Sequence, residues 1–324
     1  MKAVRTVEFS GPGGLRFEDV ADPVAAPQHI AVKVCATALN RADLLQTRGL
    51  YPAPPGVVQD IPGLEYSGEV AALGPGSTRF KVGDRVMGLV AGGAWAQTLV
   101  THEREAMLVP NGLSLEHAAA VPEAFSTAFD ALVTQGGMKA GSQVLVHAVA
   151  SGVGTAAVQL GKLFGARIIG TGRTASKLER VKLGADGLLT SGPVFAERVK
   201  ALTDGQGVDL VLELVGGDFV AESIRSMALK GTLILVGTMG GNAAALPLGL
   251  ILQKRLRLQG TALRSRSLDE KITLARAVEE RLLPEFASGA LTPVIDDVLP
   301  MSDIARGLER MANNDTFGKL VLTW

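Results

Sequence analysis

The stretch "HAVASGVGTAAVQLGK", residues 147–162, decides the fold. It follows the apolar run "QVLV", so a buried strand leads into a turn of small residues and then a helix. The free N–H groups and positive dipole end of such a helix can hold a pyrophosphate. Gly154 takes the third glycine position of the dinucleotide-binding fingerprint, where helix and strand pack closely, whereas Val149 and Ser151 take the first two. Ser151 is small and can donate to phosphate, but this motif alone describes a helix start in a generic α/β domain equally well.

The pattern of the chain changes after Pro122. Before it, short alternating runs such as "IAVKVCATAL" are broken by Gly, Pro and Asp, which indicates a β-rich domain. After it, apolar runs ("QVLVHAV", "ARIIGTG", "VDLVLELVGG", "GTLILVGTMGG") alternate with helix-like segments, which predicts a parallel sheet covered on both faces. A long charged helix is predicted over 268–289 and a strand in 317–324. We therefore predict an α/β protein in which a domain of residues 122–266 is inserted into one formed by 1–121 and 267–324.

Composition restricts the class of partner. Lys and Arg together number 32, as do Asp and Glu, so no broad basic field exists for nucleic acid or an anionic membrane, although a local patch remains open. The single cysteine, Cys35, excludes an internal disulfide and any multi-cysteine metal site. The first residues, "MKAVRTVEFSGPGG", contain no apolar signal region, so the expected location is the cytoplasm.

The strand end after the glycine turn distinguishes between cofactors. NAD-binding folds usually place an acid there to bind the ribose hydroxyls. The segment "IIGTGRTASKLER", residues 168–180, has no acid before Glu179 and offers Arg173 and Lys177 with nearby hydroxyl groups. Either cation alone is better interpreted as a solvated residue at a helix start. Together, at the expected place, they favour the extra phosphate of NADP.

With these pieces placed, the chain resembles the zinc-free quinone oxidoreductases of the medium-chain dehydrogenase/reductase superfamily, and within them the p53-inducible quinone oxidoreductase-like group. The resemblance covers essentially the whole chain and rests on blocks in order: "ALNRADLLQTRGLYPAPPG", "PGLEYSGEV", "KVGDRVMGL", "AAAVPEAFSTAFDAL", "SGVGTAAVQL", "VGTMGG" and "ALRSR". In that group the turn reads A-x-x-S-x-x-G, here Ala148, Ser151 and Gly154. The serine is thus a feature of the group.

The resemblance implies a GroES-like catalytic domain around a Rossmann domain, with NADPH in the cleft between them. From the turn, the strand end and the resemblance together, the predicted cofactor contacts are Ala150, Ser151, Gly152, Val153, Gly154, Gly172, Arg173, Lys177, Gly237, Thr238, Met239, Leu263, Arg264 and Ser265. The chain departs from the pattern in two places: Ser191 replaces a tyrosine near the adenosine, and Arg173 stands where many relatives have glycine. An added guanidinium should help phosphate binding.

No metal site is expected. Zinc-dependent members of the superfamily carry Cys and His ligands where this chain has Asn40, Leu64 and Glu123, and the lobe with four structural cysteines is absent. The four histidines are scattered and are expected to be surface or packing residues: His29, His102, His117 and His147. Cys35, in an alternating strand, is expected to be a small buried apolar residue.

Three residues are the candidates for chemistry. Asn40 begins "NRAD", which is typical of a helix N-cap with Asp43 at the third helical position, yet its amide could also face the nicotinamide ribose or the substrate. Tyr51 lies in a proline-rich loop and either lines the substrate pocket or packs the loop. Thr127 either contacts the nicotinamide or is a simple helix hydroxyl. The Arg264–Arg266 pair could bind cofactor phosphate or lie in solvent.

The implied reaction is hydride transfer from NADPH to a quinone without a metal. A quinone is already electrophilic, so orientation and hydrogen bonds to the developing oxyanion suffice. No His or carboxylate general acid is evident, and the proton could come from water. Two rival functions stay open, an NADPH-dependent alkenal or enone reductase and a non-catalytic NADPH-binding protein. The segment "LRLQGTALR" reads as a strand at a sheet edge, which predicts a homodimer through the Rossmann domain.

Overall fold

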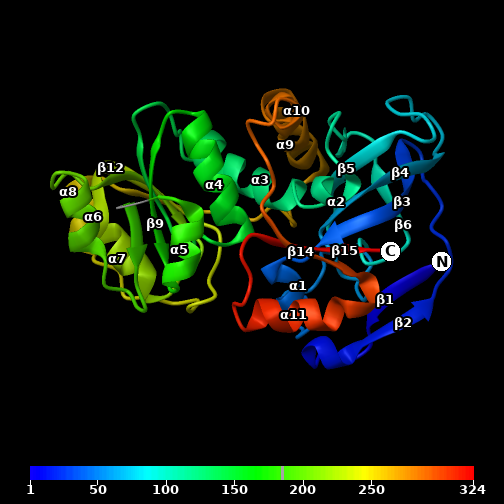
Figure 1. The fold of residues 1–324 in the computed structure, drawn as a ribbon, viewed down its shortest axis with the longest axis horizontal. Helices are drawn as coiled ribbons and strands as arrows, with labels where there is room; N and C mark the ends of the chain where they lie inside the picture. Colours follow the sequence, from blue (N-terminus) through cyan, green and yellow to red (C-terminus); the bar gives the residue numbers. More distant parts are fainter. Residues whose placement is uncertain (184–185) are drawn as a thin grey trace. The chain divides into compact units, whose positions relative to one another are not determined.

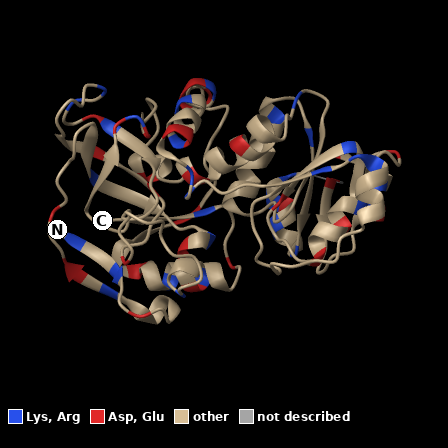
Figure 2. Ribbon diagram, turned by 180° about the vertical axis from the view of Figure 1, so that it is seen from behind, with Lys and Arg blue, Asp and Glu red and all other residues tan. Residues whose placement is uncertain are grey.

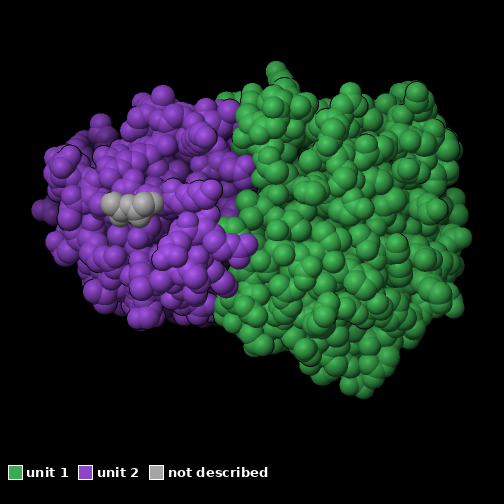
Figure 3. Space-filling model, in the orientation of Figure 1, with its two compact units in different colours: residues 1–126, 263–324 green, residues 127–262 purple. Residues whose placement is uncertain are grey.

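The computed structural model describes residues 1–183 and 186–324. The chain forms two compact units (Figure 3): unit 1 comprises Met1–Ser126 and Leu263–Trp324, and unit 2 comprises Thr127–Ala262. The boundaries predicted from sequence fell at 121/122 and 266/267. Residues 122–126 and 263–266 belong to unit 1. Phe125 packs edge-to-face on Phe286 with ring centroids 4.7 Å apart, and Arg264 donates to the Ala91 carbonyl at 2.7 Å.

Unit 2 is built on a six-stranded parallel sheet (Figure 1). Its strands are β8 (Gln143–Val146), β9 (Arg167–Gly172), β10 (Gly187–Leu189), β11 (Val208–Glu213), β12 (Met227–Leu235) and β13 (Arg257–Gly260). Its helices are the π-helical segment η2 (Asp130–Gln135), α4 (Gly152–Leu163), α5 (Ala175–Val181), α6 (Ala196–Leu202), α7 (Asp218–Ser226) and α8 (Leu248–Lys254). The order β10-β9-β8-β11-β12-β13 reverses direction at β8, so a topological switch point lies between β8 and β11. This is the Rossmann order, and it confirms the predicted α/β class.

The inner strands of unit 2, β8, β9 and β11, are apolar and buried along most of their length. Leu145, Ile169, Val211 and Leu233 are all buried in one cluster with residues of α7. A parallel sheet covered by helices on both sides requires such continuous apolar runs. The carboxyl ends of its parallel strands share one edge, which is where ligands bind in open α/β sheets.

Unit 1 contains a seven-stranded sheet of order β14-β15-β3-β4-β5-β7, with β6 paired to β3, and a separate β1-β2 pair. The strands are β1 (Lys2–Thr6), β2 (Leu15–Asp19), β3 (His29–Ala38), β4 (Glu65–Leu73), β5 (Arg85–Leu89), β6 (Thr98–His102), β7 (Ala106–Leu108), β14 (Ile295–Pro300) and β15 (Lys319–Thr323). The helices are η1 (Gly11–Gly14), α1 (Arg41–Gln46), α2 (Leu115–Ala118), α3 (Pro122–Phe129), α9 (Leu268–Arg281), α10 (Leu283–Ala287), η4 (Met301–Asp303) and α11 (Ile304–Ala312). The predicted C-terminal strand is β15, which pairs antiparallel with β3. Both ends of the chain therefore build one domain.

The predicted long helix over 268–289 is wrong in one respect. It is two helices, α9 and α10, and the break falls at Leu282 (φ −114°). Pro284 lies in the first turn of α10, because a proline ring has no N–H to donate and clashes with the preceding turn inside a helix. The start of α9 is fixed by a capping box between Ser267 and Glu270.

Two observations bear on the surface. Figure 2 shows acidic and basic residues interspersed in each unit, as the balanced charge predicts. Among the described residues, no helix is long and apolar enough to cross a membrane.

Cys35 lies in β3 and is half-buried rather than fully buried. Burial, followed by the nearby Glu69 carboxylate, raises the pKa of its thiol. The thiol is therefore held in its protonated form at neutral pH.

Strand β13 is the last strand of its sheet, and all four of its residues are exposed. This confirms the edge position that the sequence predicts. Because an uncovered edge tends to be paired, we propose that β13 pairs with β13 of a second copy across a two-fold axis. Light scattering at micromolar concentration should then give a dimer, and Leu258→Asp should shift the mass toward the monomer.

The matched control for this prediction is Leu268→Asp, which places the same charge on an exposed leucine of α9. A monomer at every concentration, or equal effects of the two substitutions, would refute pairing through β13.

Candidate functional site

The dinucleotide turn of unit 2 has the geometry that the sequence predicts. Ser151 is the N-cap of α4, and its Oγ accepts from the Gly154 N–H at 3.1 Å. A Cβ on Gly154 would lie 2.6 Å from the carbonyl oxygen of Ala148, so only glycine fits this close approach of helix and strand. Since the serine oxygen accepts within the turn, its O–H is still able to donate to a phosphate. The residues present therefore fit a pyrophosphate cradle.

The predicted phosphate-binding cations lie on the next turn of the same sheet edge. Strand β9 pairs with β8 and ends at Gly172, and α5 begins two residues beyond Arg173. Arg173 is exposed and Lys177 is half-buried. No acid interrupts this turn, so its charge suits a phosphate rather than free ribose hydroxyls.

The third predicted segment, Gly237–Met239, follows β12 at the same edge. It packs on the loop after β11, where a Cβ on Gly216 would lie 2.7 Å from the Cα of Thr238. The Gly237 N–H donates to the Glu213 carbonyl at 3.3 Å. Thus three predicted cofactor segments lie at the carboxyl edge of one sheet. They are residues 150–154, 172–177 and 237–239.

A buried polar network supports this edge from below. His147 Nδ1 lies 2.8 Å from Thr171 Oγ1, and its Nε2 lies 2.8 Å from Ser223 Oγ. Ser223 donates to Glu213 at 2.9 Å, and the other oxygen of Glu213 accepts the N–H groups of Val215 and Gly216. Burial lowers the pKa of His147, so its ring is neutral at pH 7. This confirms a packing role for His147; the part of Glu213 was not evident from the sequence.

The polar centre of unit 1 is a buried ion pair. Lys319, at the start of β15, lies 2.6 Å from Glu65 Oε1 on β4. The same ammonium donates to Asn40 Oδ1 at 2.6 Å and to the Leu39 carbonyl at 2.9 Å. All three ammonium hydrogens therefore have acceptors, which is what a buried lysine requires.

Asn40 is the N-cap of α1, as predicted. Its backbone N–H donates to Asp43 at 2.8 Å, and its side-chain amide donates to Glu65 at 2.9 Å and to the Ala38 carbonyl at 3.1 Å. Both amide hydrogens are thus used inside unit 1. A role for Asn40 as a donor to substrate stays a prediction and would require one of these bonds to open.

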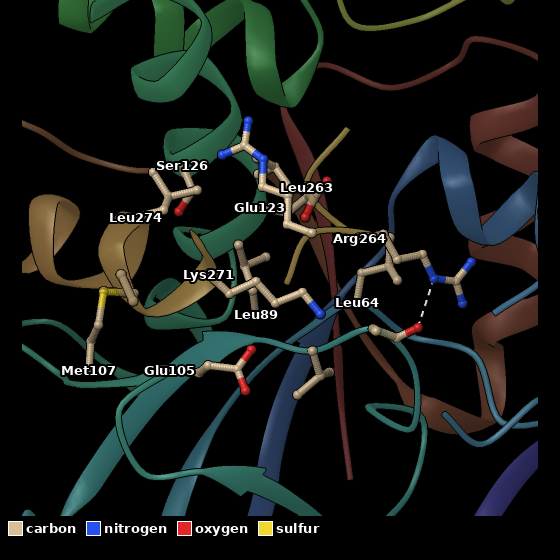
Figure 4. Close-up of a pocket in the computed structure, with 14 residues that line it drawn as sticks. Leu64, Leu89, Glu105, Met107, Glu123, Ser126, Leu263, Arg264, Lys271 and Leu274 are labelled. Carbon is tan, nitrogen blue, oxygen red and sulfur yellow. Dashed lines mark hydrogen bonds between the residues drawn. The ribbon is translucent and has the colours of Figure 1, made fainter. Parts of the chain in front are cut away.

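Glu123 is a site residue that the sequence did not reveal. It lies in the first turn of α3, and its backbone N–H donates to Glu65 Oε2 at 2.8 Å. Its half-buried side chain lines a pocket of unit 1 (Figure 4). Burial, and then the Glu65 carboxylate, raise the pKa of Glu123 to about 8. Burial likewise raises the pKa of Asp43 to about 7. The only signal in the sequence was the acid at a former ligand position.

The pocket that Glu123 lines has mainly apolar walls. They are formed by Leu64, Leu89, Met107 and Leu274 (Figure 4). The polar residues of the lining besides Glu123 are Ser126, Glu105, Lys271, Arg264 and Arg266. Apolar walls with a few convergent polar groups are typical of a small-molecule site.

Arg264 has a role other than the two that the sequence left open. It is 7% exposed, so it does not lie in solvent. Its guanidinium donates to the Ala91 carbonyl (2.7 Å), the Tyr51 carbonyl (3.0 Å) and Gln46 Oε1 (2.7 Å). It also lies 5.0 Å from the centroid of the Tyr51 ring. Arg264 therefore fixes the loop of Tyr51 within unit 1, and a contact to cofactor phosphate stays a prediction.

The remaining candidates are placed as follows. Tyr51 is half-buried, and burial raises the pKa of its hydroxyl, which stays protonated. Thr127 is buried in α3, and its Oγ1 has no hydrogen-bond partner within the described residues. That hydroxyl is closed off from solvent, so its contact with the nicotinamide stays a prediction. Leu263 lines the unit 1 pocket.

The residues at the positions of the metal ligands in zinc-dependent members of the superfamily do not form a set of metal ligands in this chain. Asn40 is committed to Glu65 and Lys319, and Leu64 has no donor atom. Within residues 1–183 and 186–324, no cluster of three His, Cys, Asp or Glu side chains could hold a metal. The histidines are packing or surface residues: His29 and His102 contact each other with ring centroids 5.2 Å apart, His117 is exposed and His147 is buried.

Comparison with known proteins agrees with both units. Residues 26–111 match the alcohol dehydrogenase GroES-like domain, and residues 152–279 match the zinc-binding dehydrogenase domain. Quinone oxidoreductase-like protein 2 of Mus musculus is 32% identical over 80% of this chain and 74% of its own length. The chain belongs to the medium-chain dehydrogenase/reductase superfamily. As in that superfamily, unit 1 is the GroES-like domain and unit 2 the Rossmann domain.

Solved structures of this superfamily show the same fold. The quinone oxidoreductase of Pseudomonas syringae pv. Tomato DC3000 is 30% identical with a TM-score of 0.87, over 100% of this chain and 99% of its own. CurK enoyl reductase is 25% identical with a TM-score of 0.88, over 99% of this chain and 98% of its own. The chain is therefore an oxidoreductase-type member that binds a nicotinamide cofactor.

The buried ion pair of the GroES-like domain gives a stability prediction. Lys319→Met leaves Glu65 buried without its cation, which should lower the free energy of unfolding by about 3–5 kcal/mol. Urea denaturation measures this. Adding Glu65→Gln to Lys319→Met should recover part of the loss, because the uncompensated charge is then gone.

The control is Lys33→Met, which changes an exposed lysine of β3 in the same sheet. It should stay within about 0.5 kcal/mol of wild type. If Lys319→Met lowered the free energy of unfolding no more than Lys33→Met does, the Lys319–Glu65 ion pair would not stabilise the domain.

Proposed function

We propose that this protein is an NADPH-dependent quinone oxidoreductase that works without zinc. The proposal is carried by the residues at the positions where zinc-dependent members of the superfamily have metal ligands. Asn40 has an amide whose hydrogens are already donated within unit 1, Leu64 has a hydrocarbon side chain, and Glu123 has a carboxyl group. A simple ketone usually needs a Lewis acid to polarise its oxygen. A quinone does not, because it is already electrophilic and gives an aromatic product.

The Rossmann domain provides the cofactor site in this proposal. The first turn of α4, with Ser151 and Gly154, would hold the pyrophosphate, and Arg173 with Lys177 would hold the additional phosphate of NADPH. When bound, the reduced nicotinamide supplies a hydride to the acceptor. Thr127 would offer its unpaired hydroxyl to the nicotinamide.

The GroES-like domain provides the acceptor pocket. Its walls at Leu64, Leu89 and Leu274 exclude water from a flat apolar ring. Tyr51 does not itself line this pocket, but Arg264, which does, holds its loop, and from there Tyr51 would present an aromatic surface or hydroxyl to the acceptor. These residues orient the acceptor, and orientation is most of what the uncatalysed reduction of a quinone lacks.

A second function remains a candidate, the reduction of an enone or alkenal at its C=C bond. It is favoured by the likeness to CurK enoyl reductase and by the acidic Glu123, because the enolate formed by such a reduction needs a proton. A non-catalytic NADPH-binding role is the third possibility.

NADPH oxidation with a panel of acceptors tests the proposal. Benzoquinones and naphthoquinones should be reduced in chelating buffer at the same rate as in untreated protein, and saturated ketones should not be reduced. Turnover of enones alone would favour the second candidate function. Absence of turnover with every acceptor, despite tight NADPH binding, would favour the third. Zinc that is bound stoichiometrically and needed for turnover would refute the metal-free mechanism.

The cofactor preference gives a separate prediction. A charge-assisted hydrogen bond is worth about 1.5–3 kcal/mol, so Lys177→Ala should weaken NADPH binding about ten- to a hundredfold and leave NADH binding nearly unchanged. Calorimetric titration of both cofactors measures this. Lys139→Ala, at an exposed lysine of the same unit, is the control. Equal affinities of the wild-type protein for NADPH and NADH would contradict the assignment.

A further inference from the structure

We infer that the carboxyl group of Glu123 donates the proton that completes reduction of the acceptor. This inference rests on the proposed function and deepens it, because it supplies the proton donor that neither the motifs nor the cofactor provides. Three features of unit 1 carry it: the place of Glu123 in the pocket, the state of its carboxyl group, and the charges around it.

The carboxyl group of Glu123 is free to act on a bound molecule. The residue lines the pocket together with Ser126, which lies one turn further along α3 (Figure 4). Its backbone N–H is fixed to Glu65, which anchors the residue at the start of the helix. Among the described residues, no group is hydrogen-bonded to its side-chain oxygens. The half-buried carboxyl group thus lines the pocket with its hydrogen-bonding capacity unused by the described residues, so it is available to a bound molecule.

The charges packed around Glu123 favour its neutral form. Glu65 on β4 and Asp43 on α1 repel a second anion, whereas Lys319 on β15 and Arg264 attract one. Lys319 is already bonded to Glu65 and Asn40, and Arg264 to three other acceptors, so neither is hydrogen-bonded to Glu123. Burial outweighs the attraction of these two cations and raises the pKa of Glu123 to about 8. At pH 7 the group therefore holds a proton that it can donate.

Glu105, the other acid of the pocket, suits this task less well. Burial raises the pKa of Glu105 too, but the neighbouring Lys271 on α9 lowers it. Every charged neighbour that acts on Glu105 lowers its pKa, whereas the leading charged neighbour of Glu123 is the Glu65 carboxylate, ahead of Lys319 and Arg264. The surroundings of the two acids therefore differ in how readily each acid gives a proton.

The proton balance is simple. Reduction of a quinone or an enone takes up one hydride, from NADPH, and one proton. The O–H bond of Glu123 breaks as its proton bonds to the oxygen of the hydroquinone anion or to the enolate. Glu123 is left as a carboxylate and regains its proton from water, while NADP⁺ leaves.

The test compares Glu123→Gln, Glu123→Asp and Glu105→Gln with wild type. Wild-type kcat should fall as the pH rises through about 8, because the donor is then ionised. Glu123→Gln should lower kcat by about 100-fold or more and abolish this fall. Glu123→Asp should keep a fall with pH, and Glu105→Gln should keep the wild-type one. NADPH affinity and thermal unfolding confirm that each variant is folded.

A readout without turnover tests the same group. Infrared difference spectra recorded across the pH range around 8 should show a protonated carboxyl band that disappears with rising pH in wild type. Glu123→Gln should lose the part of this band that titrates near 8 and keep the part due to Asp43, whose pKa is raised to about 7. A carboxyl group already ionised at neutral pH would overturn the inference whatever the enzyme reduces.

The outcomes separate the inference from the proposed function. If wild type and Glu123→Gln reduce acceptors equally, Glu123 is not the donor, although the oxidoreductase function stands. If Glu105→Gln rather than Glu123→Gln removes the fall with pH, the donor is Glu105. If wild type reduces no acceptor at all, the proposed function is wrong and the inferred proton transfer falls with it.

Discussion

The bond between Lys319 and Glu65 is the constraint on which the GroES-like domain depends. It joins β15, from the last residues of the chain, to β4, with β3 between them in the sheet. Removing two charges from water is costly, and only a full set of partners offsets that cost. Here the lysine has three acceptors, and the glutamate accepts from Lys319, from Asn40 and from the Glu123 N–H. One ion pair thus fixes the starts of α1 and α3 together with two strands.

The three acids of this arrangement, Glu65, Asp43 and Glu123, differ in how far their carboxyl groups are hydrogen-bonded. Glu65 is fully engaged in hydrogen bonds, and Asp43 accepts the N–H of Asn40. Glu123 shares their surroundings but has no bond to its carboxyl group among the described residues, and it alone of the three lines the pocket. A position that bears a metal ligand in zinc-dependent relatives is thereby occupied by an acid whose environment keeps it neutral. Burial and a fixed negative neighbour are sufficient to do this.

Local patterns predicted the Rossmann domain well because its signals are local. A continuous apolar run, a tight glycine turn and an N-capped helix are adjacent in sequence, and so Ser151, Gly154, Arg173 and Lys177 could be found there. The N-cap at Asn40 was predicted for the same reason. The roles of Lys319, Glu123 and Arg264 were not, because each depends on a partner far away along the chain. The long helix was misjudged because Pro284 also suits a first turn, and only packing shows which turn that is.

The half-buried Cys35 has a consequence for the quinones or enones that the proposed function would bring to the protein. Such compounds alkylate thiols, and the attacking species is the thiolate. A pKa raised by burial and by Glu69 keeps the fraction of thiolate at Cys35 small. Because this is the only cysteine in the chain, we expect the electrophilic acceptors of the proposed function to find little thiolate to react with, and therefore to cause little self-inactivation.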